Sequence, residues 1–151
     1  MSLPNLDRHA SFGPLALRLG LGGVFVAHAY AKAAIYTFPG TVQFFEAQGF
    51  PGFMAYPVFA TELVAGLALM AGFGTRWAAL ALMPVMLGAL KPHLAAGWMF
   101  TSPGGGWEYI AFLLAALVAQ FFVGSGAYAA ESMRSRQPVE DARAGLRHDA
   151  C

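Results

Sequence analysis

The chain has 151 residues, of which 58% are hydrophobic and 11% are charged. Soluble domains carry about 25% charged residues, so this composition indicates a single domain embedded in a membrane. The formal net charge is +1 and no basic run is interleaved with aromatic residues, which argues against nucleic-acid binding. The one cysteine is Cys151, and this excludes an internal disulfide, a Cys-x-x-Cys redox pair and a cysteine-rich metal site.

The first predicted membrane span covers about residues 14–35. About 20 apolar residues in a helix cross roughly 30 Å of hydrocarbon. Three ionisable residues interrupt the apolar run, and they are Arg18, His28 and Lys32. Small residues at a spacing of four suit close helix packing, and these are Gly23, Ala27 and Ala31. A secretory signal peptide, cleaved between residues 27 and 31, is the alternative interpretation of this segment.

An aromatic-rich segment at residues 37–53 follows the first span, with glycine and proline at several positions. Residues 40–48 lie between these helix breakers and could form a short helix in the membrane interface, where aromatic side chains are favoured. A simple hydrophobic outer loop is the equally weighted alternative.

Three further spans are predicted at about residues 53–73, 77–94 and 107–123. The second and third form an antiparallel hairpin, because only Gly74, Thr75 and Arg76 separate them. Pro84 should kink the third span and Pro92 should disturb its end. The fold class is therefore an all-α polytopic membrane four-helix bundle, with a four-span domain at 1–124 and a polar cytoplasmic tail at 125–151.

Four spans place both termini on one side of the membrane. Of the nine lysines and arginines, only Lys32 and Lys91 fall towards the side opposite the termini. By the positive-inside rule the termini are cytoplasmic, and the protein is expected in the bacterial inner membrane.

The predicted topology gathers polar side chains from all four spans in the outer half of the bilayer. The ligand-pocket candidates are His28, Lys32, Glu62, Lys91, His93, Trp107 and Glu108. The inner half holds only Arg18, near its edge, and the uncharged Gln120. A charge at the bilayer centre costs about 2.5–3.5 kcal/mol, so these groups should pair. We expect Glu62 to pair with Lys32 or His28, and Glu108 with Lys91 or His93.

The polar cluster has two interpretations. Ionisable groups inside a membrane are by default candidates for a functional site, here a small-molecule pocket. Buried charge pairs also exist solely to fix helix register, and this is the structural alternative. A metal site is not predicted, because His28 and His93 come from different spans and no His-x-x-His or Glu-x-x-His pair occurs. No catalytic residue is assigned.

Three segments carry a family resemblance: LRLGLGGVFVAH at 17–28 with Lys32, ELVAGL at 62–67 with GTRWAAL at 74–80, and GGGWEY at 104–109. In their order and spacing the chain resembles the DoxX family. It differs in having Ala29 and Ala31 where glycine and glutamine are common, and Ala65 where a second glycine is common. The resemblance implies a four-helix inner-membrane protein related to quinone-linked, DoxD-type subunits and to redox-stress complexes.

The resemblance favours the membrane subunit of a redox or respiratory complex that binds a quinone-type ligand. The sequence has no haem, flavin or iron–sulfur motif, so electrons would come from a redox partner protein. The expected contacts are the lipid bilayer, that partner and a second copy of the chain. A non-catalytic scaffold or assembly factor is the main alternative. A small-solute transporter is less favoured, because four spans without an inverted repeat are unusual for one.

Overall fold

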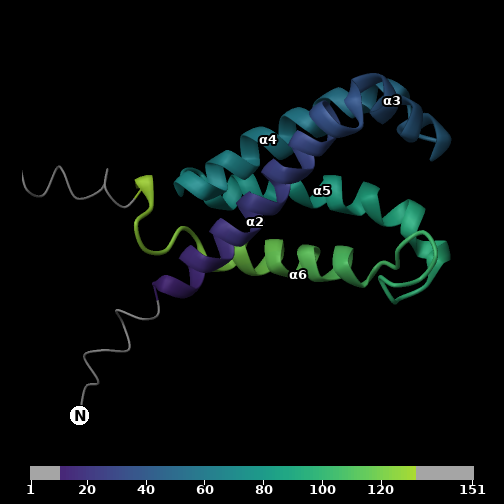
Figure 1. Ribbon diagram of the computed structural model, residues 1–151. Helices are drawn as coiled ribbons and strands as arrows, with labels where there is room; N and C mark the ends of the chain where they lie inside the picture. Colours follow the sequence, from purple (N-terminus) through teal and green to yellow (C-terminus); the bar gives the residue numbers. More distant parts are fainter. Residues whose placement is uncertain (1–10, 132–151) are drawn as a thin grey trace, which may run out of the picture.

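The computed structural model describes residues 11–131, and within that range all regular structure is helical (Figure 1). The all-α prediction is confirmed. The elements are α2 (Phe12–Tyr30), the π-helical turn η1 (Ala31–Ile35), α3 (Thr37–Ala47), the 3-10 turn η2 (Gly52–Met54), α4 (Ala55–Ala71), α5 (Thr75–His93), the 3-10 turn η3 (Leu94–Ala96) and α6 (Glu108–Val123). Most of the predicted polar tail, residues 132–151, lies outside the described residues.

The four long helices form a closed ring. Helix α2 packs against α4, α4 against α5, α5 against α6, and α6 returns to α2. In Figure 1 the start of α2, the turn between α4 and α5 and the end of α6 lie at one end of the bundle. Helix α3 and the connection at residues 97–107 lie at the other end. We call these the termini end and the loop end.

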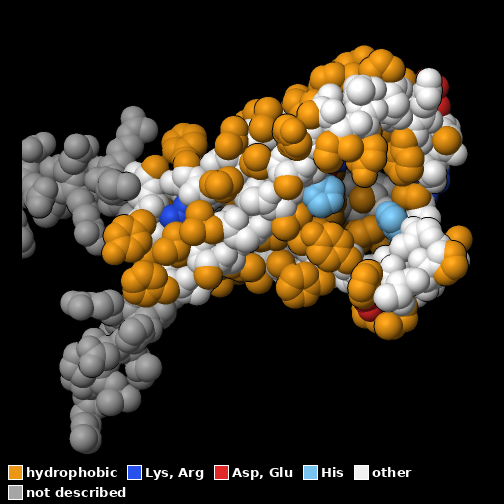
Figure 2. All heavy atoms as spheres, in the orientation of Figure 1, with side chains coloured by type: hydrophobic (Ala, Val, Ile, Leu, Met, Phe, Trp, Pro, Cys, Tyr) orange, Lys and Arg blue, Asp and Glu red, His pale blue; other side chains and the backbone are white. Residues whose placement is uncertain are grey.

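The bundle is apolar both inside and outside. Three helical segments are long and apolar enough to cross a membrane, namely Phe12–Ile35, Gly52–Ala71 and Thr75–Ala96. Helix α6 is also apolar but has 16 residues, about 24 Å at 1.5 Å per residue. Hydrophobic side chains cover much of the face in Figure 2. This is the arrangement of a membrane helical bundle, in which lipid rather than water faces the outer surface.

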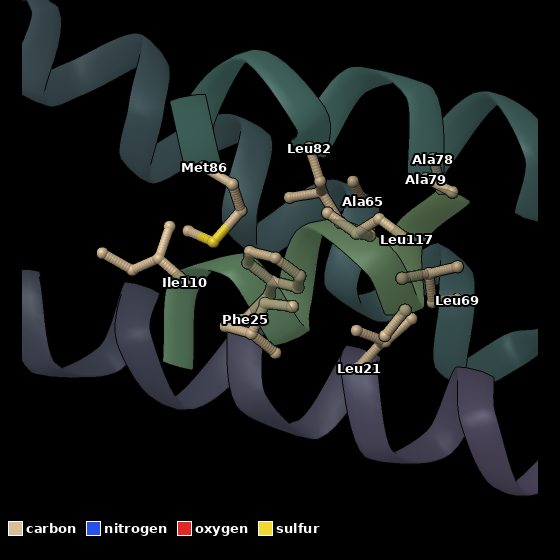
Figure 3. Close-up of a cluster of buried hydrophobic side chains, with 12 residues drawn as sticks. Leu21, Phe25, Ala65, Leu69, Ala78, Ala79, Leu82, Met86, Ile110 and Leu117 are labelled. Carbon is tan, nitrogen blue, oxygen red and sulfur yellow. The ribbon is translucent and has the colours of Figure 1, made fainter. Parts of the chain in front are cut away.

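The core lies where all four long helices meet (Figure 3). Leu21 and Phe25 of α2 contact a cluster that includes Leu69 of α4, Leu82 of α5 and Leu117 of α6. The last three are fully buried. Because each of the four helices contributes to one continuous cluster, the bundle is a single structural unit.

Helices α2 and α4 approach most closely at Gly22 and Gly66. A Cβ atom at Gly22 would lie 2.7 Å from the carbonyl oxygen of Gly66, and one at Gly66 would lie 3.1 Å from that of Gly22. The predicted packing stripe of Gly23, Ala27 and Ala31 is therefore wrong. Ala27 is exposed and no atom would crowd a Cβ at Gly23. The buried face is rotated by about one residue.

The aromatic-rich segment is a helix rather than a loop. Helix α3 begins at Thr37, three residues before the predicted start, and includes Pro39 in its first turn, where proline is tolerated. Thr37 has a positive φ of 62°, unusual for a β-branched residue. Its hydroxyl accepts a 3.4 Å hydrogen bond from the backbone N–H of Gly40. This contact satisfies one backbone N–H in the first turn of α3.

A buried arginine fastens the termini end. Arg18 is 1% exposed, and its guanidinium donates to the carbonyls of Leu69 (3.1 Å) and Met70 (2.6 Å). It also donates to the carbonyls of Ala127 (2.9 Å) and Tyr128 (3.1 Å), which follow α6. Arg18 was expected in the inner half of the bilayer, near its edge, and its partners were not predicted. It instead joins the end of α4 to the segment after α6.

Candidate functional site

A single ion pair lies inside the described part of the bundle. The ammonium of Lys32 donates to Glu62 Oε2 at 2.7 Å and to Oε1 at 2.8 Å. The Glu62 side chain is 2% exposed and that of Lys32 is 17% exposed. The expected pairing of Glu62 with Lys32 is thus present in the structure. Both carboxylate oxygens of Glu62 therefore accept a hydrogen bond from Lys32.

The π-helical turn η1 directs Lys32 towards Glu62. In a regular helix His28 and Lys32, four residues apart, would lie on one face. The wider turn, with the bond from Tyr36 N–H to the Ala31 carbonyl at 2.9 Å, begins only at Ala31, and His28 and Lys32 line one cavity. The carbonyl of Lys32 accepts a 3.0 Å hydrogen bond from the hydroxyl of Thr41. π-Helical turns of this kind occur frequently at functional sites.

An apolar cavity of about 160 Å³ adjoins the ion pair, and we call it the ion-pair cavity. It lies between α3, α4 and α5, with Lys32 contributed by η1. Aromatic and aliphatic side chains form most of its wall, and its lining residues are Lys32, Phe44, Phe45, Gln48, Phe50, Met54, Val58, Glu62, Pro84, Val85, Gly88, Ala89 and Pro92. The cavity therefore combines an apolar space with one charged pair, as small-molecule sites commonly do.

A second cavity of about 550 Å³ shares Lys32, Phe44 and Phe45 with the first, and we call it the histidine cavity. Its lining residues are His28, Ala31, Lys32, Tyr36, Gly40, Thr41, Phe44, Phe45 and His93. Histidine side chains lie around a hollow on the face shown in Figure 2. His28 and His93, from α2 and α5, are thus brought to one cavity, although they do not contact the ion pair through any hydrogen bond among the described residues.

The second expected ion pair, Glu108 with Lys91 or His93, is wrong. Glu108 Oε1 accepts a 3.1 Å hydrogen bond from the backbone N–H of Phe100. His93 Nδ1 donates to the carbonyl of Gly105 at 2.8 Å, with that of Gly104 at 3.1 Å. Both side chains satisfy backbone groups of the loop at 97–107, a competing need that a count of charges does not reveal.

Trp107 and Lys91 also act within the loop end. The rings of Trp107 and Trp98 meet edge to face at a centroid distance of 4.4 Å, so Trp107 packs against its own loop. Lys91 donates to the carbonyl of Gln48 at 2.8 Å and lies 4.5 Å from the centre of the Phe50 ring. Since Gln48 and Phe50 line the ion-pair cavity, Lys91 fastens one wall of that cavity to α5.

The candidate residues therefore separate into two sets. Lys32, Glu62, His28 and His93 line cavities, whereas Lys91, Trp107 and Glu108 hold the loop end together, and Glu108 also borders a separate surface hollow with His93. Sequence reasoning did not select Thr41, Phe44 and Phe45. The aromatic run at 44–45 was the available signal, but its helical phase was not fixed. Among residues 11–131, no group of three or more His, Cys, Asp or Glu side chains is arranged for a metal ion.

Comparisons with known proteins agree with these features. A family model described as DoxX matches residues 13–102. The chain is similar to "Putative oxidoreductase CatD" of Bacillus subtilis, with 33% identity over 85 residues, which is 56% of this chain and 62% of that protein. It is also similar to "Inner membrane protein YqjF" of Escherichia coli, with 40% identity over 68 residues, 45% of this chain and 51% of that protein.

The matched regions thus span between half and two thirds of these curated relatives. No solved structure matches the chain. The matched family region, residues 13–102, includes His28, Lys32, Glu62, Lys91 and His93, and it ends before α6. Both cavities therefore belong to the part of the chain that the family model covers.

Proposed function

Because the chain belongs to the DoxX family of multi-pass membrane proteins, we propose that it is the membrane subunit of a redox assembly and binds a quinone-type molecule in the ion-pair cavity. The observation that carries the proposal is the Lys32–Glu62 pair, buried beside an aromatic-lined cavity of about 160 Å³. We place the protein in the bacterial inner membrane, in keeping with the name of the E. coli relative, "Inner membrane protein YqjF".

The cavity has the size and lining that a quinone ring requires. An apolar cavity of about 150 Å³ in another protein holds benzene, so one six-membered ring fits this volume. Phe44 and Phe45 supply aromatic surface, and Pro84 and Gly88 of α5 also line the cavity. Removing a flat apolar ligand from lipid gains little by itself, so the polar group in the cavity must supply specificity.

Lys32 is the group suited to recognise a quinone carbonyl. An ammonium has three N–H donors, and the Glu62 carboxylate accepts from two directions. The third N–H is free to donate to a carbonyl oxygen in the cavity. Glu62 keeps the ammonium charged and oriented at low dielectric, where an unpaired charge would be costly. Glu62 is thus a positioning residue, and Lys32 holds the proton that a reduced carbonyl oxygen needs.

The electrons come from a partner protein in this proposal, because the sequence contains no haem, flavin or iron–sulfur motif. The name of the B. subtilis relative, "Putative oxidoreductase CatD", supports a redox role. The structural alternative is a scaffold in which Lys32 and Glu62 only hold α4 and η1 together. The two functions differ in one respect, which is whether the pair changes the affinity for a ligand.

Thermal unfolding of the purified protein with and without ubiquinone-1 tests the proposal. A ligand at 100 times its Kd adds about 2.7 kcal/mol to stability, which should raise Tm by about 5 °C or more. In Lys32→Met the donor is lost, so this rise should fall to less than half. Glu62→Gln keeps the shape of the side chain but removes its charge, and we expect a partial loss.

Glu46→Gln is the matched control, because Glu46 is exposed on α3 and does not line the ion-pair cavity. It should leave the quinone-dependent rise unchanged. A wild-type protein whose Tm does not respond to the quinone would refute the proposed ligand. An equal rise in wild type and Lys32→Met would refute the role of the ion pair and favour the scaffold.

A further inference from the structure

Two cavities meet at one wall beside the ion pair. Lys32, Phe44 and Phe45 line both of them. The histidine cavity, at about 550 Å³, is the larger of the two, and its remaining polar side chains are His28, His93, Tyr36 and Thr41. Thr41 already donates to the Lys32 carbonyl, so the histidines and Tyr36 are the side chains that face a ligand there with unused polar atoms.

Both histidine rings are held in the same tautomer. His28 Nδ1 lies 2.8 Å from the carbonyl of Val24, and His93 Nδ1 lies 2.8 Å from the carbonyl of Gly105. A carbonyl oxygen only accepts hydrogen bonds, so each Nδ1 carries the proton. In the neutral ring each Nε2 is then an acceptor. The structure thus presents two imidazole acceptors at one cavity, and each ring is held by a hydrogen bond from Nδ1 to a backbone carbonyl.

The depth of His28 makes this arrangement significant. His28 lies 16 residues after Phe12, about 24 Å along a segment whose 24 residues extend about 36 Å. At that depth the side chain of His28 is exposed on the surface of the protein. An acceptor that faces hydrocarbon without a donor is costly, because lipid tails cannot supply a hydrogen bond. The cavity therefore favours a molecule that brings hydrogen-bond donors of its own.

We propose that the histidine cavity is a second binding site, for an uncharged aromatic molecule with hydroxyl groups, of the phenol or hydroquinone class. Its hydroxyls donate to His28 Nε2 and His93 Nε2, and its ring packs on Phe44 and Phe45. An anion is disfavoured, because the charge of Lys32 is already matched by Glu62. A quinone is also disfavoured in this cavity, because its carbonyls cannot donate to either histidine.

Paired probes of equal shape isolate the hydroxyl groups. 4-Hexylresorcinol has two phenolic hydroxyls, and its dimethyl ether has the same ring and chain without a donor. Binding of each to the full chain in lipid nanodiscs is measured by titration calorimetry. We expect the diol to bind at least about fivefold more tightly than the ether, the ratio that a net hydrogen-bond contribution near 1 kcal/mol gives.

His28→Phe should remove most of this preference, and His28→Gln, which keeps a side-chain acceptor, should restore part of it. His28 makes its one hydrogen bond within its own helix, so both variants should fold. Tyr30→Phe is the matched control, because it removes a hydroxyl from an exposed residue that does not line the cavity. It should leave the preference for the diol unchanged.

A nitrogen-15 NMR spectrum of labelled histidine supplies a readout independent of affinity. The diol should shift the Nε2 resonance of His28 while Nδ1 stays protonated. Equal affinity for diol and ether, or the same preference in wild type and His28→Phe, would overturn the inference. The quinone-dependent rise in Tm should persist in His28→Phe, because His28 does not line the ion-pair cavity. Loss of quinone binding with intact diol binding would therefore refute the proposed function alone.

Discussion

Two buried charged side chains in this bundle, Glu62 and Arg18, are stabilised in different ways. Glu62 is matched by Lys32, an opposite charge. Arg18 instead donates to four backbone carbonyls from two separate segments. Helix α4 ends in a Schellman motif, in which Phe73 and Gly72 N–H groups bond to the carbonyls of Ala68 and Leu69. The Schellman motif leaves the Met70 carbonyl without a partner, and the guanidinium of Arg18 donates to it. The arginine therefore satisfies a carbonyl at the end of α4.

Arg18→Met should destabilise the protein by about 3 kcal/mol or more, because it leaves several buried carbonyls without a donor at about 1–3 kcal/mol each. Arg76→Met is the matched control, since Arg76 is an exposed arginine at the same end of the bundle and should change stability little. Unfolding in mixed micelles of increasing SDS content measures both. Similar values for the two variants would contradict the role of Arg18.

The Lys32–Glu62 pair was the part of the site that the sequence made predictable. A carboxylate within an apolar span needs a partner, and few cations lie at its depth. The pairing of Glu108 was not predictable by the same rule, because the N–H of Phe100 and other loop donors cannot be seen in a side-chain pattern. Unpaired backbone groups outnumber charged side chains at the ends of helices, and at the loop end Glu108 and His93 bond to these backbone groups instead of to each other.

At the scale of elements, the helices were easier to predict than their rotation. Long apolar runs bounded by glycine and proline fix the positions of α2, α4, α5 and α6. The direction of each buried face was less certain, because in a membrane both faces are apolar and periodicity is weak. Gly20 and Gly23, three residues apart, share one face of α2, and of these glycines only Gly22, on another face, contacts α4.

Gly22→Ala should destabilise the contact between α2 and α4 by about 1–3 kcal/mol, because the new Cβ would overlap the backbone of α4. Gly23→Ala on the neighbouring face meets no atom and should stabilise the protein by about 0.5–1 kcal/mol through helix propensity. Thermal unfolding followed by circular dichroism distinguishes the two. A destabilised Gly23→Ala, with Gly22→Ala unaffected, would mean that the face is wrongly assigned.

The π-helical turn η1 shows a further limit of sequence reasoning at this scale. Its sequence, Ala-Lys-Ala-Ala-Ile, is compatible with an ordinary α-helix. The wider turn depends on Thr41, ten positions beyond Ala31, whose hydroxyl satisfies the Lys32 carbonyl. Local propensity cannot indicate a turn whose carbonyl is satisfied by a side chain of the next helix, so the sequence did not predict η1.

For the whole molecule, the orientation in the membrane is the property that sequence predicts and a bundle by itself does not reveal. From the arginine excess we propose that the termini end, with Arg18 and Arg76, faces the cytoplasm. Both cavities are then near the opposite surface, because they are lined by α3 and the ends of η1 and α5 at the loop end. A ligand would reach them from the outer leaflet or the periplasm.

The single cysteine makes this orientation testable. Cys151 should not react with a membrane-impermeant maleimide in intact spheroplasts and should react after the membrane is opened with detergent. Ser102→Cys in a Cys151→Ser background should react in both cases, because residue 102 lies in the connection at the loop end. Mass-tagged reagent and gel shift measure the labelling. Reaction of Cys151 in intact spheroplasts would reverse the proposed orientation.

The four carbonyls around Arg18 have a consequence for biogenesis. Ala127 lies 109 residues after Arg18, so two of the acceptors do not exist when the first helix leaves the ribosome. At about 5–20 residues per second, the guanidinium waits roughly 5–20 s for them. During that interval water, lipid phosphates or the insertion machinery must accept its hydrogen bonds. The nascent chain can therefore form all the hydrogen bonds of Arg18 only after α6 has been synthesised. Insertion of α6 is then the event that allows the termini end to reach its final structure.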